Sequence, residues 1–187
     1  MPFILQTDRL VLRELDADDP ADARFVLALL NDADWIRHIR DAGVRDLEQA
    51  RRFIQTGPHA MYRSHGHGLW RVAGRSGDQA LGLCGLIRRE GLSDPDLGYG
   101  FLPAARGRGY AQEAALAVLD WTRRELGCHR VVAIVQPGNG PSLRLLARLG
   151  MREEGLIQLA EGQPMLKLLS IEFDPRPVGA VQICALS

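Results

Sequence analysis

Hydrophobic and polar residues alternate near the N-terminus, where residues 9–15 read RLVLREL. A period of two is typical of a strand with one buried face. Asp18-Asp19-Pro20 then predicts a helix start, because an aspartate can cap the first amide groups and proline fits the first turn. Apolar residues recur at helical spacing in three places. The first predicted helix contains Phe25, Leu29 and Leu30, and the second contains Trp35, Ile36 and Ile39. The third begins near Asp46 and contains Leu47, Ala50, Phe53 and Ile54. The segment 57–68, GPHAMYRSHGHG, leaves helix and loop both open.

The pattern becomes strand-like at Leu69. LWRVAG (69–74) and ALGLCGLIRRE (80–90) predict a hairpin across the turn-rich RSGDQ. DLGYGFL (96–102) predicts another strand, in which Gly98 and Gly100 indicate a bulge or a close backbone approach. The remaining pattern predicts a long helix over 108–126, a buried strand (HRVVAIVQP), a helix (PSLRLLARLG) and two strands near 153–161 and 164–173. This order predicts an α/β fold with a mixed sheet, parallel at least around 97–135.

Composition narrows the class of protein. The 187 residues suit one domain, which we place at 1–174 with a C-terminal tail at 175–187. The 23 basic and 23 acidic side chains cancel, which argues against a general nucleic-acid binder. The chain has no run of about 18 apolar residues to span a membrane, and the N-terminus does not read as a signal peptide. Three widely spaced cysteines indicate reduced thiols in a cytoplasmic protein, and the lack of a CxxC pair argues against structural zinc.

The sharpest local motif is PAARGRGYA (103–111), which lies between a predicted strand and the strongest helix. Gly107 and Gly109 allow a tight turn that exposes amide groups, and the helix N-terminus adds partial positive charge. Arg106 and Arg108 add further charge, so the turn suits a pyrophosphate. It lacks the Gly-Lys-Ser/Thr of a Walker A loop, and Gln112 stands where a dinucleotide fingerprint needs glycine. A plain strand–helix turn is the alternative interpretation.

The wider sequence resembles the GNAT family of acetyl-CoA-dependent N-acetyltransferases, within it the RimJ/RimL branch that acetylates ribosomal-protein N-termini and related amines. The resemblance covers residues 6–160 and rests on TDRLVLREL, GLCGL, DLGYGFLPAARGRGYAQEAALAVLDW and LGCHRVVAIVQPGNGPSLRLLARLGMREEG. It implies a central, mostly antiparallel twisted sheet, splayed between two parallel strands and flanked by helices. It also implies an acetyl-CoA site in which the backbones of Phe101 and Leu102 contact the pantetheine arm. The pyrophosphate would be held by Arg106, Gly107, Arg108, Gly109, Tyr110 and Ala111. Ala104 departs from the Gln or Arg that the family often has there.

The same resemblance assigns roles to Asn139 and Ser142, which match an Asn-x-x-Ser motif at the start of the last helix. Asn139 would bind the pantetheine and Ser142 would lie beside the sulfur. An alcohol is a far weaker acid than a thiol, so Ser142 fits a hydrogen-bond donor or proton relay better than a stoichiometric acid. The alternative is that both residues only cap the helix. Glu161 is the candidate general base, with Glu153, Glu154 or a water chain as alternatives, and each glutamate can equally be a solvated surface acid.

Other polar and apolar residues give weaker indications of function. His65-Gly66-His67 lacks a third ligand nearby, so no metal is expected. Cys84 reads as a small buried residue, and the three tryptophans read as core or pocket walls. The acids of the N-terminal third lead to the hypothesis of an acidic acceptor side suited to a cationic amine; they are Asp16, Asp18, Asp19, Asp22, Asp32 and Asp34.

The sequence therefore predicts an N-acetyltransferase that moves acetyl from acetyl-CoA to a primary amine by direct attack in a ternary complex. The amine could belong to a protein N-terminus or a small molecule, and the chain could act as a monomer or homodimer. A non-catalytic acyl-CoA-binding or sensing protein on the same fold is the alternative.

Overall fold

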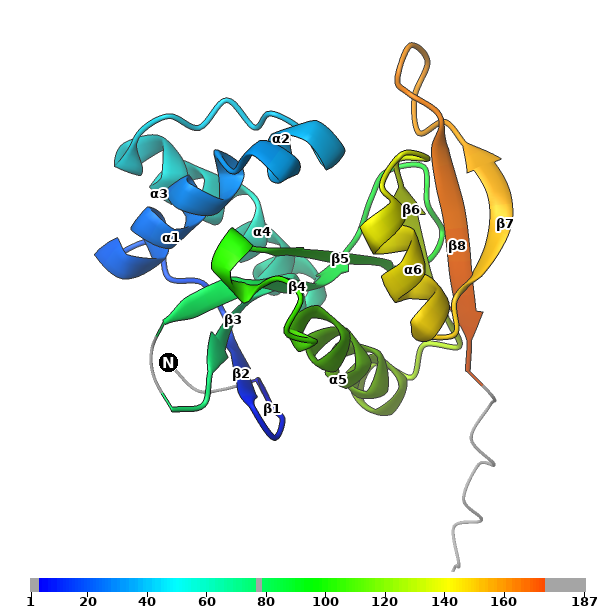
Figure 1. Cartoon of the computed structure of the whole chain (residues 1–187), viewed down its shortest axis with the longest axis horizontal. Coiled ribbons are helices and arrows are strands. Elements are labelled where there is room, and N and C mark those ends of the chain that lie inside the picture. Colours follow the sequence, from blue (N-terminus) through cyan, green and yellow to red (C-terminus); the bar gives the residue numbers. More distant parts are fainter. Residues whose placement is uncertain (1–3, 77–78, 174–187) are drawn as a thin grey trace, which may run out of the picture.

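The computed structural model describes residues 4–76 and 79–173, and the predicted tail at 175–187 lies outside these ranges. Within them, eight strands form one sheet in the order β1-β2-β3-β4-β5-β6-β8-β7 (Figure 1). Every neighbouring pair is antiparallel except β5 and β6. The strands are β1 (Leu5–Gln6), β2 (Leu10–Arg13), β3 (Leu69–Gly74), β4 (Ala80–Ile87), β5 (Asp96–Phe101), β6 (Arg130–Val135), β7 (Arg152–Ile157) and β8 (Leu166–Glu172). The helices are α1 (Pro20–Leu30), α2 (Ala33–His38), α3 (Leu47–Thr56), α4 (Pro58–His65), α5 (Tyr110–Glu125) and α6 (Gly140–Arg148).

The helix starts follow from local chemistry. Asp19, Asp32 and Asp46 each accept a hydrogen bond from an amide group in the first turn of α1, α2 and α3. The open segment 57–68 forms α4, which ends at Gly66 in the left-handed region. The largest differences from prediction are β1, whose pattern is too short to predict, and the end of β7, which lies at Ile157 instead of residue 161.

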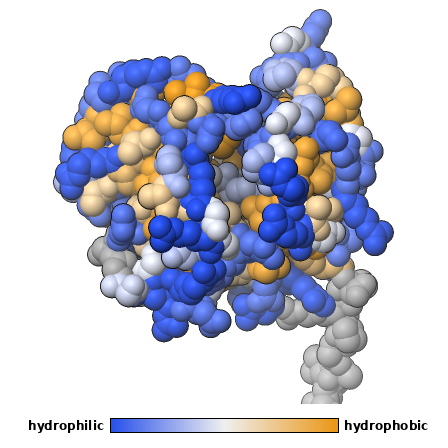
Figure 2. All heavy atoms as spheres, in the orientation of Figure 1, coloured by the Kyte–Doolittle hydropathy of each residue, from blue (hydrophilic) through white to orange (hydrophobic). Residues whose placement is uncertain are grey.

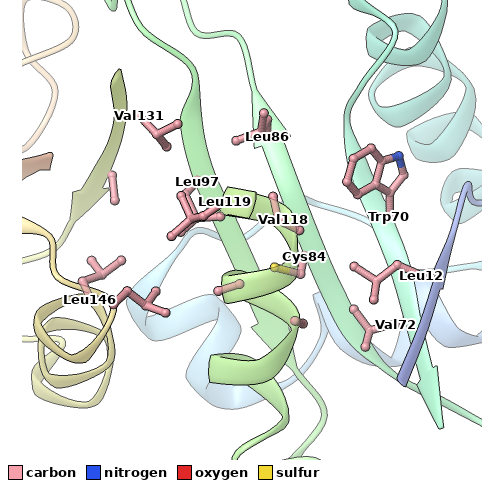
Figure 3. Close-up of a cluster of buried hydrophobic side chains, with 14 of the residues drawn as sticks. Leu12, Trp70, Val72, Cys84, Leu86, Leu97, Val118, Leu119, Val131 and Leu146 are labelled. Atoms are coloured by element: carbon pink, nitrogen blue, oxygen red, sulfur yellow. The ribbon is translucent and has the colours of Figure 1, made fainter. Parts of the chain in front are cut away.

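Helices cover both faces of the sheet, and each face has its own apolar core. On one face, α5 packs against Cys84, Leu86 and Leu97, with Leu146 of α6 in the same cluster (Figure 3). On the other face, α1, α2 and α3 bury an apolar cluster that includes Leu83 of β4. Because side chains alternate across a strand, the neighbours Leu83 and Cys84 serve opposite cores. This mixed, mostly antiparallel sheet flanked by helices confirms the predicted fold.

The parallel pair β5 and β6 is short. Asp96 and Val132 are its one registered pair, and the β5 register with β4 continues through to Phe101. Ile134 of β6 donates its backbone N–H to the Asp96 carboxylate at 3.3 Å instead of to a strand carbonyl. The two strands therefore separate beyond Asp96, as the resemblance implies. Since the β4–β5 register has no shift, the bulge considered for Gly98 and Gly100 is absent from that pair.

Candidate active site

The turn between β5 and α5 exposes a series of backbone donors. Gly107 and Gly109 have φ values of 72° and 78°, in the left-handed region that favours glycine. The backbone N–H groups of Gly107, Arg108 and Gly109 have no partner among the described residues. Because α5 begins at Tyr110, the N–H groups of Tyr110 and Ala111 also lack an intrahelical acceptor. The turn thus combines unpaired donors with the positive end of a 16-residue helix.

Arg106 has a different role from its neighbours in this turn. Its backbone N–H donates to Pro103 at 3.2 Å. Its guanidinium donates to the Phe101 carbonyl at 2.9 Å, to Asp34 at 2.6 Å and to Asp32. The side chain therefore joins α2 to the turn, and its charge is balanced by two carboxylates instead of being free for an anion. Arg108 is exposed and keeps its charge available.

Arg9, directly before β2, contacts the turn through its side chain, and no sequence pattern predicts this role. Its guanidinium donates to the Arg108 carbonyl at 3.0 Å and lies over the Tyr110 ring, 4.8 Å from the centroid. It also pairs with Glu113 in the first turn of α5, with Nε 2.6 Å from Oε2. Thr7 and the Arg9 backbone N–H bind the other Glu113 oxygen. No spacing pattern could link Arg9 to residues about a hundred positions away.

The separation of β5 from β6 leaves backbone groups of β5 unpaired. Leu102, directly after the end of β5, donates its N–H to the Leu81 carbonyl of β4 at 2.9 Å. Since alternate residues of an antiparallel strand face the same neighbour, Gly98 and Gly100 also direct their amide groups toward β4. Tyr99 and Phe101 direct their amide groups to the other side, into the space between the separated strands β5 and β6, which we call the gap. Of the two residues predicted to contact pantetheine, Phe101 therefore offers a free amide donor, whereas the Leu102 amide is used within the sheet.

The two glycines of β5 lie on the face of the sheet that the N-terminal helices cover. A Cβ atom on Gly100 would lie 2.4 Å from Cζ3 of Trp35, so the indole rests directly on the strand backbone. Gly98 faces Ile87 and Leu69 in the same way. Trp35 is 8% exposed, and its Nε1 has no hydrogen-bond partner among the described residues. The close approach predicted for these glycines is therefore confirmed, and Trp35 keeps an unused donor beside the strand.

The start of α6 lies across the gap. Asn139 caps the helix, because its Oδ1 accepts from the Ser142 N–H at 3.2 Å. Ser142 does not cap: its hydroxyl lies 2.6 Å from the Tyr99 hydroxyl. Burial raises the pKa of Tyr99 to about 12, against a smaller lowering by this hydrogen bond. Tyr99 is a second functional candidate that the sequence did not predict, although it lies inside the DLGYGFL motif.

The candidate bases lie on the C-terminal strands. Glu161 is exposed in the connection between β7 and β8, which projects at the same edge of the molecule as α2 (Figure 1). Glu153 pairs with Lys167 at 2.8 Å. Glu154 accepts from Ser170 and pairs with Arg130, which together hold the pKa of that carboxyl below its usual range. The structure thus leaves Glu161 as the unpaired candidate among these three. Figure 2 shows a notch between this hairpin and the N-terminal helices.

The remaining candidates fall outside this site. Cys84 is fully buried, and burial raises the pKa of its thiol. His65 and His67 stack with centroids 5.8 Å apart, and no group of three or more metal-binding side chains occurs in ranges 4–76 and 79–173. Among the acids of the N-terminal third, Asp19 and Asp22 pair with Arg13, and Asp32 and Asp34 bind Arg106. Arginines therefore balance four of the six acids of the predicted acidic surface. No helix within those two ranges is long and apolar enough to cross a membrane.

Comparisons with known proteins fit this geometry. The family model for the acetyltransferase (GNAT) domain matches residues 9–152. The protein YkkB of Bacillus subtilis (strain 168) is 33% identical over 149 residues, covering 79% of this chain and 84% of YkkB. An acetyltransferase structure from Agrobacterium tumefaciens str. C58 has a TM-score of 0.73 at 26% identity, covering 92% of this chain and 95% of the other. The ribosomal L7/L12 α-N-protein acetyltransferase RimL, in complex with coenzyme A, has a TM-score of 0.75 at 18% identity, covering 93% and 99%. At that identity the likeness concerns the fold.

Proposed function

Because the chain belongs to the acetyltransferase (GNAT) family, we propose that it transfers acetyl from acetyl-CoA to a primary amine. The observation that carries the proposal is the row of unpaired backbone donors at the start of α5, beside the gap between β5 and β6. Gly107, Arg108, Gly109, Tyr110 and Ala111 present amide groups suited to a pyrophosphate. Arg106 is the exception within the predicted set, and its part is to hold α2 against the turn.

The gap accommodates the pantetheine arm and the thioester. In this proposal, the amide groups of Tyr99 and Phe101 point at the thioester carbonyl and stabilise the negative charge that develops on it. Fixed donors aimed at a developing oxyanion are usually the largest catalytic contribution. Ser142 faces the sulfur from α6. Asn139 holds Ser142 in place through the helix cap, and its amide nitrogen remains available to the arm.

The amine enters from the side of α2 and the β7–β8 connection. Direct attack in a ternary complex requires a neutral amine, so a proton must leave before or during attack. Glu161 is exposed in that connection and has no ion pair that would hold it elsewhere; it is our proposed base, with a water chain as the alternative route. RimL acts on a ribosomal-protein α-amine according to its name. For this chain, a protein α-amine and a small-molecule amine both remain candidate acceptors in a cytoplasmic setting.

Thiol release separates catalysis from simple acyl-CoA binding. Purified protein is incubated with acetyl-CoA, with and without a panel of primary amines, and free coenzyme A thiol is followed by a chromogenic reagent. The proposal expects release that depends on one class of amine, and thermal stabilisation by acetyl-CoA alone. Stabilisation without amine-dependent release would favour an acyl-CoA-binding protein. Absence of stabilisation at saturating acetyl-CoA would contradict the coenzyme site itself.

A further inference from the structure

Tyr99 and Ser142 connect the two elements that border the gap. Tyr99 lies on β5 and Ser142 in the first turn of α6, 43 residues later. Their hydroxyl oxygens are 2.6 Å apart, and the Tyr99 hydroxyl is also 3.3 Å from the Ser142 carbonyl. Both side chains are only partly buried, so the pair lies at the edge of the core cluster that α5 and α6 cover.

The chemistry of the two groups determines which one donates. A phenol is a stronger acid than an alkyl hydroxyl, and the alkyl oxygen is the better acceptor, so the favoured arrangement has Tyr99 donating to Ser142 Oγ. The 2.6 Å contact is also the shorter of the two available to the phenol proton. Ser142 has one proton, which this arrangement leaves free for a further acceptor. Donation into its oxygen also strengthens that proton as a donor.

We propose that Tyr99 is a positioning residue that donates to Ser142 Oγ and aims the Ser142 proton at the leaving sulfur. This inference rests on the proposed acetyl transfer. As the amine nitrogen forms its bond to the acyl carbon, the C–S bond breaks and its electron pair goes to sulfur. Ser142 donates a hydrogen bond to that thiolate, the extra proton on nitrogen is lost to the base or water, and solvent protonates the thiolate on release. Tyr99 stays neutral throughout, which its burial favours.

A double-mutant cycle tests this role. Tyr99→Phe removes the phenol oxygen and keeps the ring, so kcat should fall about tenfold, equivalent to one hydrogen bond in the transition state. KM for acetyl-CoA should change by less than about twofold. Ser142→Ala should lower kcat at least as much, and Tyr99→Phe should have no further effect in that background, because its action passes through Ser142. Tyr99→His keeps an N–H donor at this position and should recover part of kcat. If Tyr99→Phe does not fold, Tyr99→His takes its place in the cycle.

Tyr62→Phe is the matched control. Tyr62 is a buried tyrosine whose hydroxyl donates to the Leu69 carbonyl, away from the gap. Its loss should lower the melting temperature and leave kcat unchanged. Independent, additive losses from Tyr99→Phe and Ser142→Ala would overturn the inference, as would an unchanged kcat in Tyr99→Phe. Both of those results leave the proposed function standing, because the wild type still turns over. Absence of turnover by the wild type with every amine would overturn both.

Discussion

The Trp35 indole lies directly on the backbone of Gly100, so closely that a Cβ atom at Gly100 would be 2.4 Å from the ring carbon Cζ3. Trp35 belongs to α2, and Arg106 links the same helix to the turn between β5 and α5 through Asp32 and Asp34. The helix that we propose to border the acceptor is thus held by β5 on one side and by the turn between β5 and α5 on the other. An acceptor and a coenzyme bound on opposite sides of β5 would therefore meet at a rigid strand.

Gly100→Ala should displace Trp35 and weaken acceptor binding. Fitting a methyl group against a ring with no room costs about 1–3 kcal/mol, so KM for the amine should rise about tenfold while acetyl-CoA affinity changes little. Steady-state kinetics with each substrate varied in turn measures the difference. Gly74→Ala in β3 is the control, because a Cβ there meets nothing within 4 Å. Equal effects on both substrates would argue that Trp35 does not border the acceptor site.

Gly109→Ala should weaken acetyl-CoA binding. Gly109 has φ +78°, and a Cβ there would lie 3.3 Å from the Arg9 guanidinium that braces the turn. The strained backbone costs about 1 kcal/mol or more, and the displaced amide groups should reduce affinity about tenfold, as measured by isothermal titration. Gly127→Ala is the control: it has φ +60° beyond the other end of α5 and open space around it. It should lose stability and keep its affinity. Similar affinities in the two variants would count against a coenzyme site at this turn.

Arg106→Gln should affect the acceptor more than the coenzyme. Its guanidinium binds Asp32, Asp34 and the Phe101 carbonyl, so its loss frees α2 and leaves two carboxylates unpaired. KM for the amine should rise about fivefold or more, whereas affinity for acetyl-CoA should change less than about twofold, as expected of a side chain that does not bind phosphate. Arg124→Gln, which removes an exposed pair with Asp120, is the control. A selective loss of acetyl-CoA affinity would show instead that Arg106 binds the pyrophosphate.

The ion pair and hydrogen bonds that Glu113 forms with Arg9 and Thr7 should be sensitive to acid. Burial alone would raise the pKa of this carboxyl, but hydrogen bonds from Thr7 and Arg9 outweigh burial and lower it. A lowered pKa in the folded state gives stability that is complete above the unfolded pKa of about 4.3 and is lost as the pH falls through the folded value. Glu113→Gln should therefore cost about 1 kcal/mol at pH 7. Urea unfolding of both proteins between pH 7 and pH 3 should show the difference shrinking in acid, and a constant difference would contradict this account.

The fold was predictable because its signals are local. The alternation at residues 10–13, the aspartate caps of three helices and the left-handed Gly107 and Gly109 each depend on a few adjacent residues. The two-residue β1 has no such signal, because its pairing with β2 and not its own pattern makes it a strand. The end of β7 was missed because apolar residues continue past Ile157 into the connection.

The candidate site was predictable only where its chemistry is backbone chemistry in a glycine turn. Arg9, Trp35 and Tyr99 reach the site through side-chain contacts across 43 to 99 residues of sequence, which no periodicity encodes. For the same reason, sequence alone assigned the Arg106 charge to an anion. Asp32 and Asp34, which take up that charge, lie more than 70 positions earlier.

Transfer of a labelled acetyl group tests the central claim most directly. Protein, [13C2]acetyl-CoA and a panel of peptide α-amines and small primary amines are incubated together, and the amines are analysed by mass spectrometry. The account predicts that at least one class of amine gains the labelled acetyl group at a rate that Ser142→Ala lowers about tenfold or more. A protein that binds acetyl-CoA tightly and labels no amine, or labels amines equally well after Ser142→Ala, would contradict the claim that this gap is a catalytic acetyltransferase site.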